Sequence, residues 1–370
     1  MRHFSLLLIA LVLLFITPAR AQNDRPLVFL AQGDLWAWSL TNPTVRQLTQ
    51  QGTVSAPMLA PNDGRIAYRA LAAVNADELA NLQTEGFIAD YDLPTDLYLL
   101  DPLTGETRII AGQPVPPNLT MAGGGRVRSA PAWSPDGNAI AWVEFGFRQT
   151  DAQIIVQPLD ETQPQVLVTG IVLNDARAPE VRWGRSGIAL RLTLQADGAQ
   201  RFELYAHDGA GLSVISYSPP VDEYVQLYDW VRAGESDLLG VLLSSGRWAL
   251  FDAATGSEVL TADVPVLVNS QMPDAPALRF GVTPELGFFW EMVFAQPSAA
   301  SVAFPGAPGS VALSPDGSAV AFTGYPEFGA LAIWQNGIIE SITVTGSQSS
   351  DFLFVSSVLW GNIAWGMLQN

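Results

Sequence analysis

Short apolar segments separated by polar turns recur along most of the chain, and within them apolar residues alternate with polar or small ones. The clearest copies are APAWSPDGNAIAW at 130–142 and SVALSPDGSAVAF at 310–322, and MLAPNDGRIAY at 58–68 is a third. Alternation with a period of two is typical of β-strands, whose successive side chains point to opposite faces. Each copy therefore predicts two antiparallel strands joined by a tight turn.

The residues of this turn suit a chain reversal. Pro135 presets its own φ, Asp136 can bond to nearby backbone, and Gly137 accepts a positive φ. We therefore interpret these turn residues as structural. Four looser copies bring the total to seven, and they are VRWGRSGIAL from 181, LYDWVRAGESDLLGVLL from 227, FGVTPELGFFW from 280 and SVLWGNIAW from 357.

A second hairpin follows most of these pairs, as in DLYLLDPLTGETRII at 96–110 and RWALFDAATGSEVL at 247–260. Four strands per unit, with a polar turn in each hairpin, form the blade of a β-propeller. The fold class we predict is all-β, a β-propeller of four-stranded antiparallel blades, with seven blades favoured and six as the alternative. We expect the N- and C-terminal strands to pair and to close the ring, which leaves no exposed edge.

The form W-S-P-D-G, followed by D-L-Y-x-x-D-x-x-T-G, resembles the TolB-like or WD40-like (PD40-type) β-propeller repeat of exported bacterial proteins. Residues 134–137 and 314–317 carry the closest matches, and the other copies are degenerate. The resemblance covers nearly all of the chain after residue 21. It implies the propeller fold and leaves the function open. No α/β domain of the TolB kind is expected before the repeats, so the resemblance does not extend to a role in the Tol system.

The first 21 residues have a different pattern. Arg2 precedes an apolar run at 6–16, and Ala19 and Ala21 form a small-x-small cleavage site. This arrangement predicts a signal peptide at 1–21, cleaved near Ala21, with retention as an uncleaved anchor as the alternative. Residues 22–370 are then a single propeller domain with an insertion at about 71–95. We expect a secreted or periplasmic protein, a monomer or weak oligomer, with no membrane span after cleavage.

Charge and residue types narrow the function. The chain carries 18 basic residues, all of them arginine, against 36 acidic residues, for a net charge of −18. An acidic chain repels nucleic acid, so we expect no such partner. With no cysteine and with His207 as the single histidine beyond the leader, thiol catalysis and a multi-histidine metal site are excluded. We therefore predict no catalytic residues, no cofactor and no metal.

Long loops gather arginine and aromatic residues on the face opposite the Ser-Pro-Asp-Gly turns, and such residues concentrate binding energy in interfaces. The candidate partner-binding residues are Arg126, Arg128, Phe145, Phe147, Arg148 and Arg177. Alternatively, these arginines only pair with acidic residues of the insertion, which include Asp77, Glu78, Glu85, Asp90 and Asp92. The recurring tryptophans Trp133, Trp183, Trp230 and Trp360 are expected to pack between blades.

The leading hypothesis is a non-enzymatic binding or scaffolding propeller of the cell envelope that recognises a protein, peptide or glycan through this loop-rich face. The alternative is an exported hydrolase or lyase that uses carboxylates at the mouth of the central channel. Two carboxylates about 5–9 Å apart in a pocket would favour the enzyme. An arginine and aromatic patch without such a pair would favour binding.

Overall fold

The computed structural model describes residues 25–74, 76–84, 93–161, 163–173, 178–193, 199–261, 263–269, 276–283, 287–293, 302–305, 311–325, 329–342, 355–361 and 363–367. The expected leader at 1–21 and the candidate residue Arg177 lie outside these ranges. Among the described residues, no helix is long and apolar enough to cross a membrane.

Antiparallel sheets account for nearly all of the regular structure. One sheet has the order β28–β1–β2–β3 and contains β1 (Leu27–Ala31), β2 (Asp34–Trp38), β3 (Arg46–Gln47) and β28 (Val355–Leu359). The next contains β4 (Ser55–Leu59), β5 (Ile66–Leu71), β6 (Thr95–Leu100) and β7 (Thr107–Ala111) in chain order. A third contains β8 (Arg126–Arg128), β9 (Ala132–Trp133), β10 (Ala139–Gly146), β11 (Asp151–Pro158) and β12 (Gln165–Val172), with both β8 and β9 paired to β10.

Two further four-stranded sheets follow the same pattern. One contains β13 (Glu180–Gly184), β14 (Gly187–Thr193), β15 (Gln200–Tyr205) and β16 (Gly211–Tyr217). The other contains β24 (Val311–Leu313), β25 (Ala319–Tyr325), β26 (Gly329–Gln335) and β27 (Ile338–Ser341).

The remaining sheet is larger because a late strand joins two groups. It contains β17 (Val225–Ala233), β18 (Ser236–Leu243), β19 (Trp248–Asp252), β20 (Pro265–Asn269), β21 (Ala277–Thr283), β22 (Gly287–Val293), β23 (Val302–Pro305) and β29 (Ile363–Met367). Strand β29 lies antiparallel to β20 and pairs briefly, in parallel, with β17. The sequence did not indicate this parallel contact.

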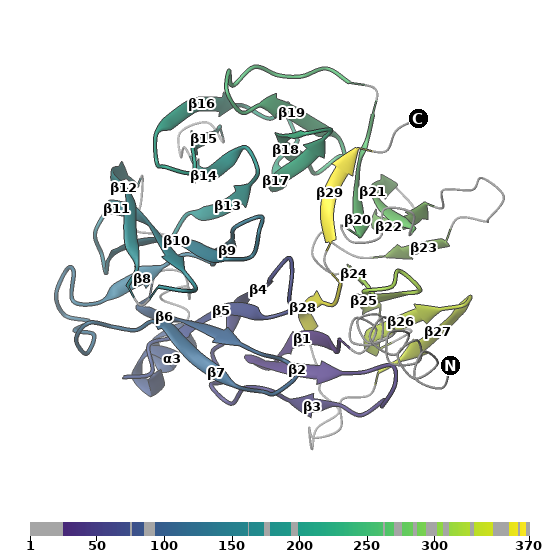
Figure 1. Ribbon diagram of the computed structural model, residues 1–370, viewed down its shortest axis with the longest axis horizontal. Coiled ribbons are helices and arrows are strands. Elements are labelled where there is room, and N and C mark those ends of the chain that lie inside the picture. The colour runs from purple at the N-terminus through teal and green to yellow at the C-terminus, as the bar shows by residue number, and fades with distance from the viewer. Residues whose placement is uncertain are drawn as a thin grey trace, which may run out of the picture.

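The sheets follow one another around a common centre in chain order (Figure 1). This radial arrangement of antiparallel sheets is that of a β-propeller, as the repeats predict. Strands β1 and β28 pair antiparallel, with Phe29 opposite Val358, so segments from the two ends of the chain share a sheet. The helix α3 (Ala76–Thr84) lies in the expected insertion, and its Leu79 is fully buried in the core.

The Ser-Pro-Asp-Gly turns are held by their own side chains. Ser134 Oγ donates to Asp136 Oδ1 at 2.6 Å and accepts from the backbone N–H of Ala139 at 2.9 Å. Gly137 has a φ of 69°, which only glycine adopts without strain. The turn at Ser314 repeats these bonds, with Asp316 Oδ1 at 2.6 Å. The side chains of each turn are therefore satisfied within it, as expected for a structural element, and Asn62 and Asn269 of neighbouring sheets donate to the backbone oxygens of Asp136 and Pro315.

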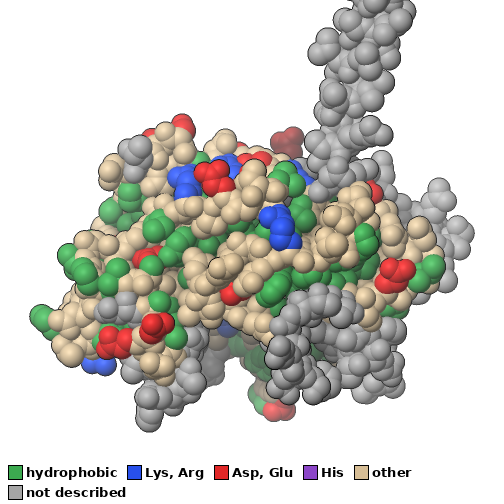
Figure 2. Space-filling model, turned by 90° about the horizontal axis from the view of Figure 1, so that it is seen from below, with side chains coloured by type: hydrophobic (Ala, Val, Ile, Leu, Met, Phe, Trp, Pro, Cys, Tyr) green, Lys and Arg blue, Asp and Glu red, His purple; other side chains and the backbone are tan. Residues whose placement is uncertain are grey.

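Buried aromatic residues pack between neighbouring sheets. Trp133 Nε1 donates to the backbone oxygen of Met58 at 2.9 Å, and Trp230 Nε1 donates to that of Arg182 at 3.3 Å. In both cases the indole reaches the preceding sheet, as expected for packing between blades. Trp183 differs, since its Nε1 donates to the exposed His207. On the side seen in Figure 2, acidic side chains are scattered among arginines rather than gathered in one patch.

Candidate functional site

The structure brings the loop-face candidates together but buries several of them. Arg128, on β8, is 3% exposed, and its Nε lies 2.7 Å from Glu144 Oε2. Phe145 and Phe147 are each 2% exposed and belong to the hydrophobic core. These three side chains therefore cannot contact a partner without rearrangement, which corrects their assignment as surface binding residues.

Among the described members of the cluster, Arg126 and Arg148 are accessible. Arg126 is paired with Glu144 at 3.8 Å, and Arg148 stacks on the ring of Phe147, with 4.9 Å between the guanidinium carbon and the ring centre. Within the described residues, the ion-pair partners of Arg126 and Arg128 are Glu144 and Asp96. Glu85, Asp90 and Asp92 of the insertion lie outside the described ranges, so pairing with them stays a prediction. A binding role for Arg126 and Arg148 stays a prediction.

A pocket of about 180 Å³ lies at the opposite ends of the strands, beside the first-to-second-strand turns. Its walls come from four neighbouring blade turns and from β29, and they include Met58, Leu59, Trp133, Arg182, Arg185, Asp229, Arg232, Asp237 and Trp365. A cavity needs about 10–15 Å³ of such space to hold one water, so the pocket has room for a small organic group. It can hold a group about the size of one amino-acid residue.

Charged residues enter this pocket where two copies of the repeat depart from the others. The position that Ala132 and Ala312 occupy is apolar in the closest repeats, but it is Arg182 and Asp229 in the copies that contain β13 and β17. The position that Pro135 occupies in its repeat is likewise charged in these two copies, where it is Arg185 and Arg232. The same strand-and-turn geometry therefore presents charged groups at the pocket instead of turn residues.

Arg182 is held by its own sheet and by the next one. Its guanidinium lies 3.5 Å from Glu180 and 5.3 Å from the ring centre of Tyr228. Burial by itself lowers the pKa of Arg182, but the nearby charge of Asp229, with Tyr228 and Glu180, raises it overall. Arg182 is therefore a fixed positive charge in the pocket wall.

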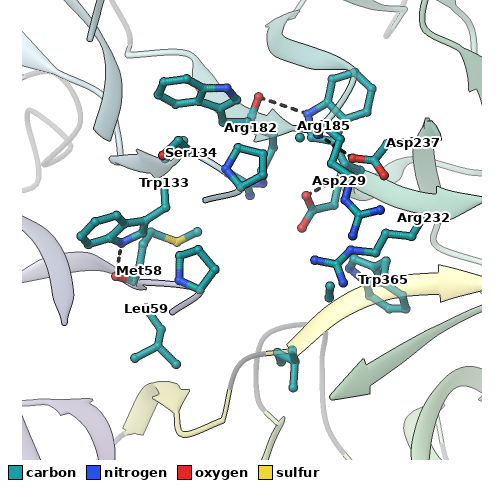
Figure 3. Close-up of a pocket in the computed structure, with 18 residues that line it drawn as sticks. Met58, Leu59, Trp133, Ser134, Arg182, Arg185, Asp229, Arg232, Asp237 and Trp365 are labelled. Atoms are coloured by element: carbon teal, nitrogen blue, oxygen red, sulfur yellow. Dashed lines mark hydrogen bonds between the residues drawn. The ribbon is translucent and has the colours of Figure 1, made fainter. Parts of the chain in front are cut away.

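Asp229 is a half-buried residue in the same wall. Its Oδ1 accepts the backbone N–H of Trp230 at 2.8 Å. Burial raises the pKa of Asp229, and the charge of Arg182 and this hydrogen bond only partly oppose the rise. Figure 3 shows the carboxyl group directed into the space between the walls.

Arg185 and Arg232 form the least satisfied part of the pocket. Burial and the neighbouring charge of Arg185 lower the pKa of Arg232, and Asp237 opposes them. No carboxylate within the described ranges forms an ion pair with either guanidinium. Asp237 is only 4% exposed, and its Oδ2 accepts the backbone N–H of Arg185 at 2.6 Å, which fixes the turn against β18. Two like charges are thus held close together, an arrangement that an anion would relieve.

The opposite wall is apolar. Figure 3 shows Met58, Leu59 and Trp133 on one side of the pocket, across from Asp229, Arg232 and Asp237. Ile363 and Ala364, from β29, add further apolar surface. The pocket therefore combines cationic groups with an apolar wall. The candidate residues predicted from the sequence lie at the other ends of the strands. A position-by-position comparison of the repeats, which shows arginine replacing alanine and proline, is the signal that would have found the pocket residues.

No family model matches the sequence, and no curated protein matches it. Among solved structures, TolB from Acinetobacter baumannii aligns over 93% of this chain and 67% of its own, with 15% identity and a TM-score of 0.43. An oligogalacturonate lyase from Vibrio parahaemolyticus aligns over 81% of this chain and 82% of its own, with 12% identity and a TM-score of 0.48. The β-propeller domain of the Trilobed protease from Pyrococcus furiosus aligns over 79% and 83%, with 13% identity and a TM-score of 0.41.

The chain is therefore similar to TolB and to other β-propellers. It spans about half the length of a prolyl endopeptidase that it also resembles, 51% of that chain. These proteins differ in what they do, so the likeness concerns architecture and carries no conclusion about activity.

Proposed function

We propose that the protein is an exported, non-enzymatic binding propeller that holds the anionic group of a ligand in the pocket between its blade turns. The observation that carries this proposal is the pair Arg185 and Arg232, two neighbouring guanidinium groups on a chain of net charge −18. Arginine presents a planar set of donors that matches carboxylates and other oxoanions. An anion placed between them gains two favourable interactions and removes their mutual repulsion.

The same proposal includes seven blades, closed by the pairing of β1 with β28. The eight-stranded sheet divides at β29 into β17–β19 and β20–β23, so the six sheets supply seven groups of strands. Ring closure would give the pocket a rigid frame, because its walls belong to several blades and to β29. A rigid frame lowers the entropy that a ligand must remove on binding.

A second candidate function is a carboxylate-dependent hydrolase or lyase. It is favoured by the raised pKa of Asp229, which suits a general acid, and by the presence of Asp237 in the same pocket. Against it, Asp237 is almost fully buried and is bound to the backbone of Arg185, so it lacks the access that a second catalytic carboxylate requires.

The experiment measures binding of 8-anilinonaphthalene-1-sulfonate, which joins a sulfonate to apolar rings, to the protein purified after export. We expect the Arg185→Gln/Arg232→Gln variant to bind about tenfold to a hundredfold more weakly, since hydrogen bonds to charged groups contribute about 1.5–3 kcal/mol. Arg247→Gln is the matched control, because Arg247 is exposed, lies in the turn between β18 and β19 and pairs with Glu223 in the link before β17.

Equal affinity of the double variant and the wild type would overturn the proposal, provided that both have the same melting temperature. Asp229→Asn separates the two candidate functions. If the protein is a binding propeller, this variant still binds the probe. If it is an enzyme, the wild type turns over a substrate and Asp229→Asn abolishes that turnover.

A further inference from the structure

The pocket has two walls of different chemistry, and together they define a ligand. Arg185 and Arg232 lie on one side, and Met58, Leu59 and Trp133 lie on the other (Figure 3). Resting on the proposed function, we infer that the pocket takes a free carboxylate borne by an apolar residue, as at the C-terminal residue of a peptide. The two walls would then bind the two ends of one residue.

The cationic wall selects the carboxylate. Arg185 and Arg232 both line the pocket and lie on the same side of it (Figure 3), so an anion in the pocket faces both side chains. A carboxylate can accept two parallel N–H bonds from one arginine and further bonds from the other. A neutral amide at the same place offers one oxygen and no charge, and it leaves the repulsion between the arginines in place.

The apolar wall selects the side chain. The side chains of Met58, Leu59, Trp133 and Ile363 offer few polar groups to a ligand, and the indole N–H of Trp133 is already bonded to Met58. A sugar acid carries hydroxyl groups around its ring, and against this wall they would lose their hydrogen bonds to water without replacement. An aliphatic side chain buries apolar surface there and loses nothing.

Asp229 completes the match. Its carboxyl is directed into the space between the walls, and one of its oxygens already accepts a backbone N–H. The backbone N–H of a bound residue is a donor for the remaining oxygen of Asp229. The nitrogen, the carboxylate and the side chain of that residue are all attached to its α-carbon, so all three groups lie near one another in the pocket. The volume of about 180 Å³ admits one residue, so the rest of a peptide would extend out of the pocket.

The test compares N-acetyl-leucine with N-acetyl-leucinamide, which differs only in lacking the carboxylate, by isothermal titration calorimetry. N-acetylglycine removes the side chain, and glucuronate supplies a sugar acid. We expect N-acetyl-leucine to bind at least tenfold more tightly than each of the other three. In Arg232→Gln the difference between acid and amide should collapse, and in Arg247→Gln it should persist. Free leucine distinguishes the source, because tighter binding of leucine than of N-acetyl-leucine assigns the site to a free amino acid rather than a peptide end.

The outcomes separate this inference from the proposed function. If glucuronate binds more tightly than N-acetyl-leucine and depends on Arg232, the ligand class is wrong while the anion-binding function stands. If acid and amide bind equally in the wild type, the carboxylate is not recognised and the inference fails. If no anion, including 8-anilinonaphthalene-1-sulfonate, depends on Arg185 and Arg232, both proposals fail.

Discussion

The turn after β9 and the turn after β13 occupy equivalent places in neighbouring sheets, but their polar groups differ in what they bind. After β9, Ser134 and Asp136 bond to each other and to the backbone of their own turn. After β13, Arg185 gives its backbone N–H to Asp237 of the next sheet, and its side chain lies at the pocket. The side chains of the first turn bond within that turn, although Asn62 of the preceding sheet donates to the backbone oxygen of Asp136. In the second turn, a carboxylate of the next sheet fixes the backbone.

This difference separates stability from function within one repeat. Side chains that bond within their own turn have no hydrogen-bonding groups left for a ligand. A turn fixed from the next sheet can leave a charged side chain without an ion pair at little cost to the fold. The degenerate copies of a repeat are therefore the places where a propeller can carry a site.

The largest expected effect is on stability and concerns the tryptophan that precedes each turn, Trp133 in β9 and Trp183 in β13. Trp133 is 6% exposed and bonds to Met58 in the preceding sheet, so Trp133→Ala should lower the free energy of unfolding by about 3–5 kcal/mol. Trp183 is only partly buried and bonds to the exposed His207, so Trp183→Ala should cost about 1–2 kcal/mol. Urea denaturation followed by circular dichroism measures both. Equal losses would show that the two turns are equally structural.

Much of the fold could be predicted from this repeat, because period-two alternation and Pro-Asp-Gly turns are local signals. The hairpins at Ala130 and Ser310 are where the sequence placed them, and β1 and β28 pair as segments of the two chain ends. The parallel contact of β29 with β17 could not be predicted, because it joins residues far apart and has no period of its own.

The candidate site was harder to predict, for two physical reasons. The sequence does not distinguish an arginine or phenylalanine that faces solvent from one that faces the core. Arg128 and Phe145 were therefore predicted at the surface, whereas the structure buries both. The pocket residues lie in different sheets, and only the packing of the β13 sheet against β17 brings Arg185 and Arg232 together. Their signal was a departure from the repeat, which matters only once the equivalent positions are known to face one pocket.

A smaller effect should appear in the pH dependence of stability. The hydrogen bond from Ser134 and those from Asn138 hold the pKa of Asp136 below its usual value, so Asp136 contributes stability above its unfolded-state pKa and loses it as the pH falls. Asp229 is opposite in sign. Burial raises its pKa, so the stability it contributes is present at low pH and is lost as the pH rises through the folded-state pKa.

Asp136→Asn should therefore cost about 1 kcal/mol at pH 7, from weakened hydrogen bonds, and less at pH 3. Asp229→Asn should cost nothing at pH 7 or should stabilise the protein, and it should lose that advantage at pH 3. Melting temperatures of both variants and the wild type at the two pH values decide the matter. A destabilised Asp229→Asn at pH 7 would mean that its carboxylate is an essential partner of Arg182.

The smallest effect concerns His207, which connects the second turn to solvent. The indole N–H of Trp183 can only donate, so His207 Nδ1 accepts it at 2.9 Å, and His207 Nε2 donates to the backbone oxygen of Arg185 at 2.9 Å. The imidazole ring therefore joins the indole of Trp183 to the backbone of the turn that contains Arg185.

Replacing His207 by alanine removes both bonds, so His207→Ala should loosen Trp183 and the turn that positions Arg185, and it should weaken binding of 8-anilinonaphthalene-1-sulfonate about twofold to threefold. Glutamine at this position can accept from Trp183 through its oxygen and donate to the backbone of Arg185 through its nitrogen. His207→Gln should thus retain the affinity of the wild type. Equal affinity of His207→Ala and the wild type would show that His207 has no part in positioning the second turn at the pocket.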